Sequence, residues 1–339
     1  MTDRIVLVHV GFPKTASTWL RNRVLANESL GFTCPFGART AQAIETFVLH
    51  PLFHFDVQAA RETFLPALTK AWQNNKVPVI SEETLLGDIV VGKYWGERVM
   101  GNMRRTFARG QLKILFTIRE QKQLIFSAYK EYVRGGGYMS IDSYLWSGKR
   151  RIGYRGPLHL DALQYDVIYE NLVREFGPEN VLTLTQEELS GDPKSAVAKL
   201  QSWLGMENTE LTSTMKMNVG MRGFTLYVKS KLNRYIPTSD LMHEHVPLSR
   251  RILDKLCRIS EFSAPNWLHN RYERMYRREI EMAVGCYFEE SNKRLAARVA
   301  SVRNFVYGYS KLQDHPRSTD SSPAAAPDGQ PAQSVGKLG

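Results

Sequence analysis

Apolar runs rich in β-branched residues alternate with stretches of helical periodicity along the first two thirds of the chain. Short continuous apolar runs are typical of buried parallel strands, and we expect strands at 4–11, 77–81, 112–118 and 180–185. Apolar residues spaced by three and four predict helices at 17–29, 39–48, 57–74, 94–109, 121–134, 158–176 and 192–204. Such alternation predicts an α/β fold, in which helices cover both faces of a mostly parallel sheet.

The last third of the chain has a different pattern. Residues 224–312 are helical in periodicity and basic, whereas residues 313–339 are rich in Pro, Ala, Ser and Gly and have no periodicity. We therefore predict a single domain over 1–312, with 224–312 as a basic helical extension of it. Residues 313–339 are predicted to be a disordered tail.

The first predicted strand ends in a turn that can bind an anion. Gly11 ends the apolar run, Pro13 turns the chain, and a helical pattern starts at Ser17 or Thr18. Free N–H groups and the helix dipole favour negative charge at such a helix start, and Lys14 adds a positive charge. The stretch predicts a bound phosphate-like group, although it lacks the Gly-Lys-Ser/Thr of the usual P-loop.

A second candidate anion site follows the strand predicted at 112–118. Arg119 stands at the end of this strand, and Ser127 lies eight residues later on the helix predicted at 121–134. A guanidinium offers a fork of donors and a serine offers a hydroxyl, so that the two can hold one phosphate together.

Both segments resemble the sulfotransferase family. Residues 13–20, Pro-Lys-Thr-Ala-Ser-Thr-Trp-Leu, resemble its 5′-phosphosulfate loop, Pro-Lys-x-Gly-Thr/Ser-Thr-x-Leu, with Ala16 where the family often has Gly. Residues 118–130, Ile-Arg-Glu-Gln-Lys-Gln-Leu-Ile-Phe-Ser-Ala-Tyr-Lys, resemble its 3′-phosphate segment, which has the same Arg-to-Ser spacing. The resemblance covers about 1–223 and implies a three-layer α/β/α, P-loop NTPase-like sulfotransferase fold.

The resemblance also implies the co-substrate and the residues that bind it. The donor would be 3′-phosphoadenosine 5′-phosphosulfate (PAPS), with PAP as product, and no metal is expected. The residues implied in donor binding are Lys14, Thr15, Ala16, Ser17, Thr18, Trp19, Arg119 and Ser127, with Arg222 and Gly223 as a further element near the 3′-phosphate.

Two glutamates are candidates for a general base. The strand at 77–81 leads into Glu82 and Glu83, and ligands of open α/β sheets bind beyond the carboxyl ends of the strands. Glu82 matches the register of carbohydrate-type sulfotransferases, and Glu83 matches that of many bacterial relatives, so both remain candidates. Lys14 is the candidate that stabilises charge on the bridging phosphate oxygen. His9, within the first strand, is expected to be structural.

We expect a sulfotransferase that transfers a sulfuryl group from PAPS to a hydroxyl or amine, on a glycan or glycolipid. The alternatives are a P-loop kinase-like phosphotransferase, a sulfotransferase of small phenols or alcohols, and a nucleotide-binding module without chemistry.

The net charge of +11 is concentrated in the last third of the chain and bears on which anionic partners the protein could bind. Residues 216–318 hold 19 Lys/Arg and 10 Asp/Glu. Solvated helix faces explain many of these charges, but the excess also suits an acidic glycan, a phosphorylated lipid carrier or a membrane face. No nucleic-acid motif accompanies the charge.

The three cysteines lack metal-ligand spacing, and no apolar run reaches the ~20 residues that span a bilayer. With no signal peptide evident, we expect a cytoplasmic protein, and the basic third leaves open a peripheral contact with the inner membrane face.

Overall fold

The computed structural model describes residues 4–49, 53–108, 110–146, 156–211, 220–236, 248–303 and 305. In these residues, five parallel strands form a central sheet in the order β2-β3-β1-β6-β9. Their bounds are Val6–Gly11 (β1), Phe32–Thr33 (β2), Val77–Ser81 (β3), Leu112–Ile118 (β6) and Val181–Thr185 (β9). Two small pairs accompany the sheet, namely β4 (Gly87–Asp88) with β5 (Lys93–Tyr94), and β7 (Leu145–Trp146) with β8 (Leu158–His159).

Helices follow most of the strands. Their bounds are Ser17–Leu20 (α1, continued by a π-helical turn, Arg21–Leu25), Ala41–Ile44 (α2, continued by Glu45–Leu49), Val57–Gln73 (α3), Gly96–Thr106 (α4), Gln121–Arg134 (α5), Ile141–Tyr144 (α6), Tyr165–Phe176 (α7), Gln186–Gly191 (α8), Pro193–Trp203 (α9), Gly223–Leu232 (α10), Leu248–Ser263 (α11), Asn266–Val284 (α12) and Glu289–Ala296 (α13). Short 3₁₀ turns lie at Glu28–Leu30, Leu160–Leu163, Pro178–Asn180, Asn233–Tyr235 and Ala300–Val302.

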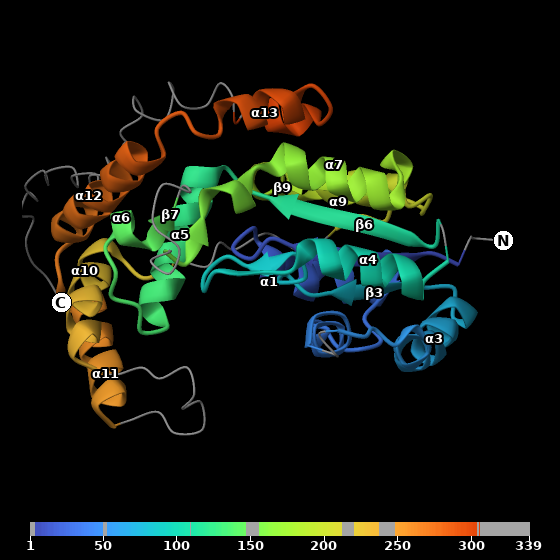
Figure 1. Ribbon diagram of the computed structural model, residues 1–339, viewed down its shortest axis with the longest axis horizontal. Coiled ribbons are helices and arrows are strands. Elements are labelled where there is room, and N and C mark those ends of the chain that lie inside the picture. Colours follow the sequence, from blue (N-terminus) through green and yellow to red (C-terminus); the bar gives the residue numbers. More distant parts are fainter. Residues whose placement is uncertain are drawn as a thin grey trace, which may run out of the picture.

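The alternation of side chains along β1 divides the core between the two faces of the sheet. Val6, Val8 and Val10 belong to a cluster that also contains residues of α3, α4, α5 and α7. Leu7 belongs to the opposite cluster, with residues of α1, α8 and α9. The predicted three-layer α/β/α arrangement, with a parallel sheet between helices, is therefore confirmed (Figure 1).

Helices α10, α11 and α12 of the basic C-terminal region lie at the end of the molecule opposite the N-terminus (Figure 1). There α12 packs on α5 and α10, and α10 packs on α11. Farther along the chain, α13 packs on α7. The C-terminal helices therefore add a wall beside α5, the helix that follows β6.

Several boundaries differ from the sequence prediction. The helix predicted over 158–176 is wrong in its first part, because β8 and a 3₁₀ turn precede α7. There the His159 ring accepts a hydrogen bond from the Asp161 N–H, which favours a turn over a helix. The sequence also missed β2 and α8, although a Thr185–Glu188 capping box marks the start of α8.

Two further findings concern the rest of the chain. The tail predicted over 313–339 lies outside the described residues. Among the helices that are described, none combines the length and the apolar character needed to cross a bilayer.

Candidate active site

A cavity of about 620 Å³ opens where β1, β3 and β6 end. Its walls come from the loop after β1, Glu83 after β3, helix α5 from Gln123 to Arg134, and Arg277 of α12, with Gln186, Gly220 and Met221 beside them. Most of the donor-binding residues proposed from the sequence line it, namely Lys14, Ala16, Ser17, Thr18, Trp19, Arg119 and Ser127. The structure thus brings the two candidate anion-binding segments, a hundred residues apart in sequence, onto one cavity.

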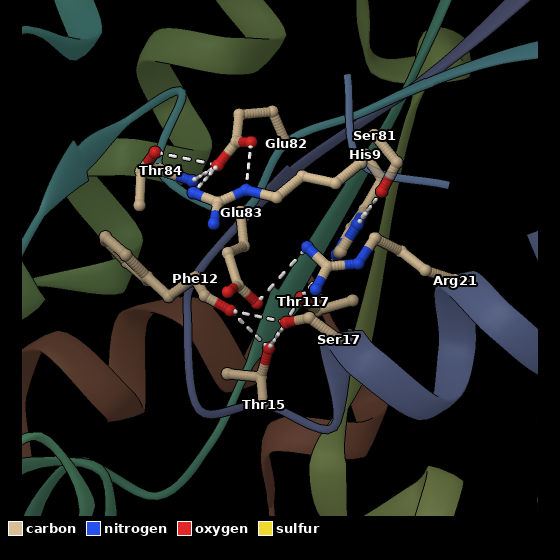
Figure 2. A network of polar contacts seen from close by, with 11 residues as sticks. His9, Phe12, Thr15, Ser17, Arg21, Ser81, Glu82, Glu83, Thr84 and Thr117 are labelled. Carbon is tan, nitrogen blue, oxygen red and sulfur yellow. Dashed lines mark hydrogen bonds and ion pairs between the residues drawn. The ribbon is translucent and has the colours of Figure 1, made fainter. Parts of the chain in front are cut away.

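The loop after β1 is tightly folded by its own polar groups. The Thr15 and Ser17 hydroxyls both donate to the carbonyl of Phe12, at 2.5 and 3.1 Å (Figure 2). Thr15 is fully buried and its hydroxyl also contacts Thr117 Oγ1 at 2.8 Å, so it shapes the loop from inside. Ala16 has φ 66°, in the left-handed region that favours glycine, which explains why glycine suits this position.

Glycine is required where this loop begins. Gly11 has φ +98°, and a Cβ there would lie 2.0 Å from the carbonyl oxygen of Glu83. The close approach of these backbones fixes the end of β1 against the residues after β3. As a result, Glu83 and the Lys14 loop share one cavity wall.

Lys14 is paired with a carboxylate in this structure. Its Nζ donates to Glu131 Oε2 at 3.0 Å, and Arg134 donates to the same carboxylate. Burial alone would raise the pKa of Glu131, but the hydrogen bonds from Lys14 and Arg134 bring it below its usual value. Glu131 therefore stays charged and holds the Lys14 ammonium at the cavity wall.

The two candidate bases have different surroundings, as Figure 2 shows. Glu82 is 1% exposed, and it accepts hydrogen bonds from Arg39 at 2.6 and 3.0 Å and from the Thr84 hydroxyl at 2.8 Å. Glu83 lines the cavity, and its Oε2 lies 3.6 Å from Nη1 of Arg21. Of the two carboxylates, Glu83 is therefore the one that faces the cavity.

The opposite wall is strongly cationic. Arg119 follows β6, and Lys130 and Arg277 lie beside it on α5 and α12. Burial lowers the pKa of both Arg119 and Lys130, and the positive charge of Arg277 lowers both further. Lys130 Nζ lies 4.3 Å and the Arg277 guanidinium carbon 4.7 Å from the centre of the Phe126 ring. Nearby carboxylates, Glu187 and Glu120 at Arg119 and Glu273 at Lys130, offset part of this effect, and an anionic ligand would relieve the rest.

The sequence reasoning missed several of these side chains. Lys130 and Arg134 follow Ser127 at helical spacing, so the period of α5 was a usable signal for them. Arg21 follows the loop by one helical turn. Arg277 had no local signal, since only the packing of α12 on α5 brings it to the cavity.

Arg222 and Gly223 lie outside the cavity lining, although Gly220 and Met221 are part of it. The Arg222 N–H donates to Glu261 Oε1 at 3.0 Å, and its guanidinium donates to the Glu261 carbonyl and to Asn266. A Cβ on Gly223 would lie 2.3 Å from the carbonyl oxygen of His269, so glycine permits α10 to cross α12 closely. The structure places this pair at the junction of α10, α11 and α12.

His9 joins three strands below the site. Its ring nitrogens contact the hydroxyls of Ser81, at 2.8 Å, and Thr117, at 3.0 Å (Figure 2). Burial, with a smaller contribution from the charge of Arg21, lowers the pKa of His9 to about 3. A fully buried, neutral histidine of this kind ties β1 to β3 and β6, and it does not reach the cavity.

Comparison with known proteins finds similarity to solved structures alone. No family model matches the chain, and no curated protein matches it. Among solved structures, the chain is similar to sulfotransferases. One is a sulfotransferase from Alicyclobacillus acidocaldarius (18% identity over 73% of this chain and 99% of that one, TM-score 0.45). A second is the sulfotransferase domain of the Synechococcus PCC 7002 olefin synthase (13% identity, 77% and 95%, TM-score 0.37).

A mouse sulfotransferase in complex with PAP also matches (12% identity over 89% of this chain and 88% of that one, TM-score 0.28).

Proposed function

We propose that this protein is a PAPS-dependent sulfotransferase that acts on a hydroxyl or amine of a glycan or glycolipid. The observation that supports this most is that the Lys14 loop and the Arg119–Ser127 segment line the same cavity. Among the described residues, five cationic side chains and two carboxylates line this cavity: Lys14, Arg119, Lys130, Arg134 and Arg277 against Glu83 and Glu131. Its volume lies within the roughly 300–1,000 Å³ that small-molecule sites occupy.

The residues suit a nucleotide with anionic groups at both ends. Lys14, Ser17 and Thr18 would hold the 5′-phosphosulfate, and Arg119 and Ser127 would hold the 3′-phosphate, with Lys130 and Arg277 beside them. Trp19 lines the same cavity, and its buried indole N–H has no hydrogen-bond partner among the described residues.

In the proposed reaction, Glu83 accepts the proton of the acceptor hydroxyl as its oxygen bonds to the sulfur of PAPS. The bond between that sulfur and the bridging phosphate oxygen breaks, and Lys14 stabilises the negative charge left on that oxygen. The products are the sulfated acceptor, PAP and a protonated Glu83, which returns its proton to water. Arg21, beside Glu83, holds the carboxylate in place.

The acceptor class is proposed from the polar lining of the cavity. Gln123 and Gln186 line the cavity together with the charged side chains. Amides and charges suit a polyhydroxylated acceptor better than a planar phenol.

The test is transfer of radiolabelled sulfate from PAPS in the presence of EDTA, with polysaccharides, glycolipids and small phenols as acceptors. We expect label on a glycan or glycolipid, with release of PAP. Label on phenols alone would disprove the acceptor class. Absence of transfer to every acceptor, together with phosphoryl transfer from ATP and Mg²⁺, would replace the proposal with a phosphotransferase.

A further inference from the structure

Helix α11 exposes an apolar stripe to solvent. Ile252, Leu256 and Ile259 follow one another at spacings of four and three residues, and they are 51%, 54% and 56% exposed. Phe262, at 88%, and Trp267, at 63%, continue the apolar surface to the start of α12. The opposite face of α11, with the buried Leu253 and Cys257, faces the protein, where α11 packs on α10. Contiguous exposed apolar surface of this kind marks an interaction site more often than chance.

The charges of α11 are separated between its two sides. Arg251, Lys255 and Arg258 are exposed and follow the apolar stripe along the helix. Both carboxylates of α11 contact α10 or Arg222, the residue that precedes α10. Asp254 forms an ion pair with Lys229, and Glu261 accepts the Arg222 N–H at 3.0 Å. The outward surface of α11 therefore combines apolar and cationic side chains.

We propose that this outward face of α11 docks on an anionic lipid bilayer. An amphipathic helix with an apolar face flanked by Lys and Arg lies in the membrane interface, where its cations meet anionic headgroups. Tryptophan is enriched at the same depth, which suits Trp267. A second copy of this face would bring Arg251, Lys255 and Arg258 against like charges, so the bilayer is the better complement.

The docking helix is joined to the active site. Glu261 of α11 holds Arg222, the neighbour of Met221 in the cavity lining. Helix α11, and not its outward face, is thus linked to the cavity lining through Arg222. This link suits a lipid-linked acceptor, a conclusion that rests on the proposed function, whereas the docking itself does not.

The experiment is flotation of the full-length protein with phosphatidylcholine vesicles, prepared with and without phosphatidylserine. We expect binding about tenfold or more tighter when phosphatidylserine is present, because each Lys or Arg near an anionic surface contributes separately. The Ile252→Ser/Leu256→Ser variant should lose most of the binding, and Lys255→Glu/Arg258→Glu should lose the preference for phosphatidylserine. Val91→Ser/Val167→Ser is the matched control, since these residues are 50% and 44% exposed elsewhere.

Several results would overturn the proposal. Equal binding to both vesicle types, absence of binding, or equal loss of binding in the control variant would each do so. A dimer in sedimentation that Ile252→Ser/Leu256→Ser dissociates would show instead that a second copy covers the face. Because vesicle binding needs no turnover, failure of the sulfotransferase assay leaves this test intact.

Discussion

The two sides of the cavity are built in different ways. On one side, Lys14 and Glu83 follow the neighbouring strands β1 and β3, and short loops fix them. On the other side, Gln123 of α5 meets Arg277 of α12, 154 residues later, through a hydrogen bond of 2.6 Å. The strand side holds the groups that we assign to proton transfer and bridging-oxygen stabilisation, and the helical side holds half-buried cations. Substitutions on the strand side should therefore lower turnover, and those on the helical side should lower donor affinity.

The largest effect is expected at Glu83. Glu83→Gln removes the proposed base, and a positioned base contributes roughly 10²–10⁴ in rate, so turnover should fall by that factor while PAP binding is retained. Turnover is measured by release of PAP at saturating donor, and binding by calorimetry.

The neighbouring glutamate provides the control for this experiment. Glu82→Gln should keep turnover near the wild-type value and lower the free energy of unfolding by about 1–3 kcal/mol, because the buried hydrogen bonds from Arg39 and Thr84 are weakened. The opposite pattern, with loss of turnover only in Glu82→Gln, would move the base to the buried carboxylate and refute the assignment of Glu83.

A somewhat smaller effect is expected at Lys14. Lys14→Ala should lower turnover by about 10²–10³, the usual cost of removing one group that stabilises developing oxyanion charge. PAP affinity should fall less than turnover, because PAP lacks the transferred sulfuryl group. Lys14→Arg is the control, and it should recover part of the rate by restoring a cation. If Lys14→Ala lowered only donor affinity, Lys14 would belong functionally to the helical side.

Arg119 should show the reverse pattern to Lys14. Arg119→Ala should weaken PAP binding about ten- to a hundredfold, since hydrogen bonds to charged groups contribute roughly 1.5–3 kcal/mol. Turnover at saturating PAPS should change little. Ser127→Ala, which removes a neutral hydroxyl from the same corner, should weaken binding less. Equal losses of turnover in Arg119→Ala and Glu83→Gln would contradict the division between the two sides.

The same contrast explains what the sequence could predict. The strands at 77–81 and 112–118 and the helix at 121–134 have the bounds found in the structure, because strong apolar periodicity and local caps define them. Seven of the predicted donor-binding residues line the cavity. They and the Glu82–Glu83 pair could be predicted because each lies in a short, continuous segment of the sequence. The choice within that pair could not be made, since it depends on Arg39, which approaches Glu82 from 43 residues away. Arg277 is a long-range case of the same kind, placed by tertiary packing alone.

The smallest predicted effect tests whether that tertiary placement matters for binding. The side chain of Arg277 is 41% exposed and already paired with Glu273, so solvent and the pair both reduce its contribution. Arg277→Ala should therefore weaken PAP binding only about three- to tenfold, and the loss should shrink as salt is raised, because salt screens partly exposed charges. Arg278, the next residue of α12, is exposed and does not line the cavity. Arg278→Ala removes the same net charge, so any additional loss of PAP affinity in Arg277→Ala measures the local contact of Arg277. Equal losses of PAP affinity in the two variants would show that α12 acts only through its overall positive charge.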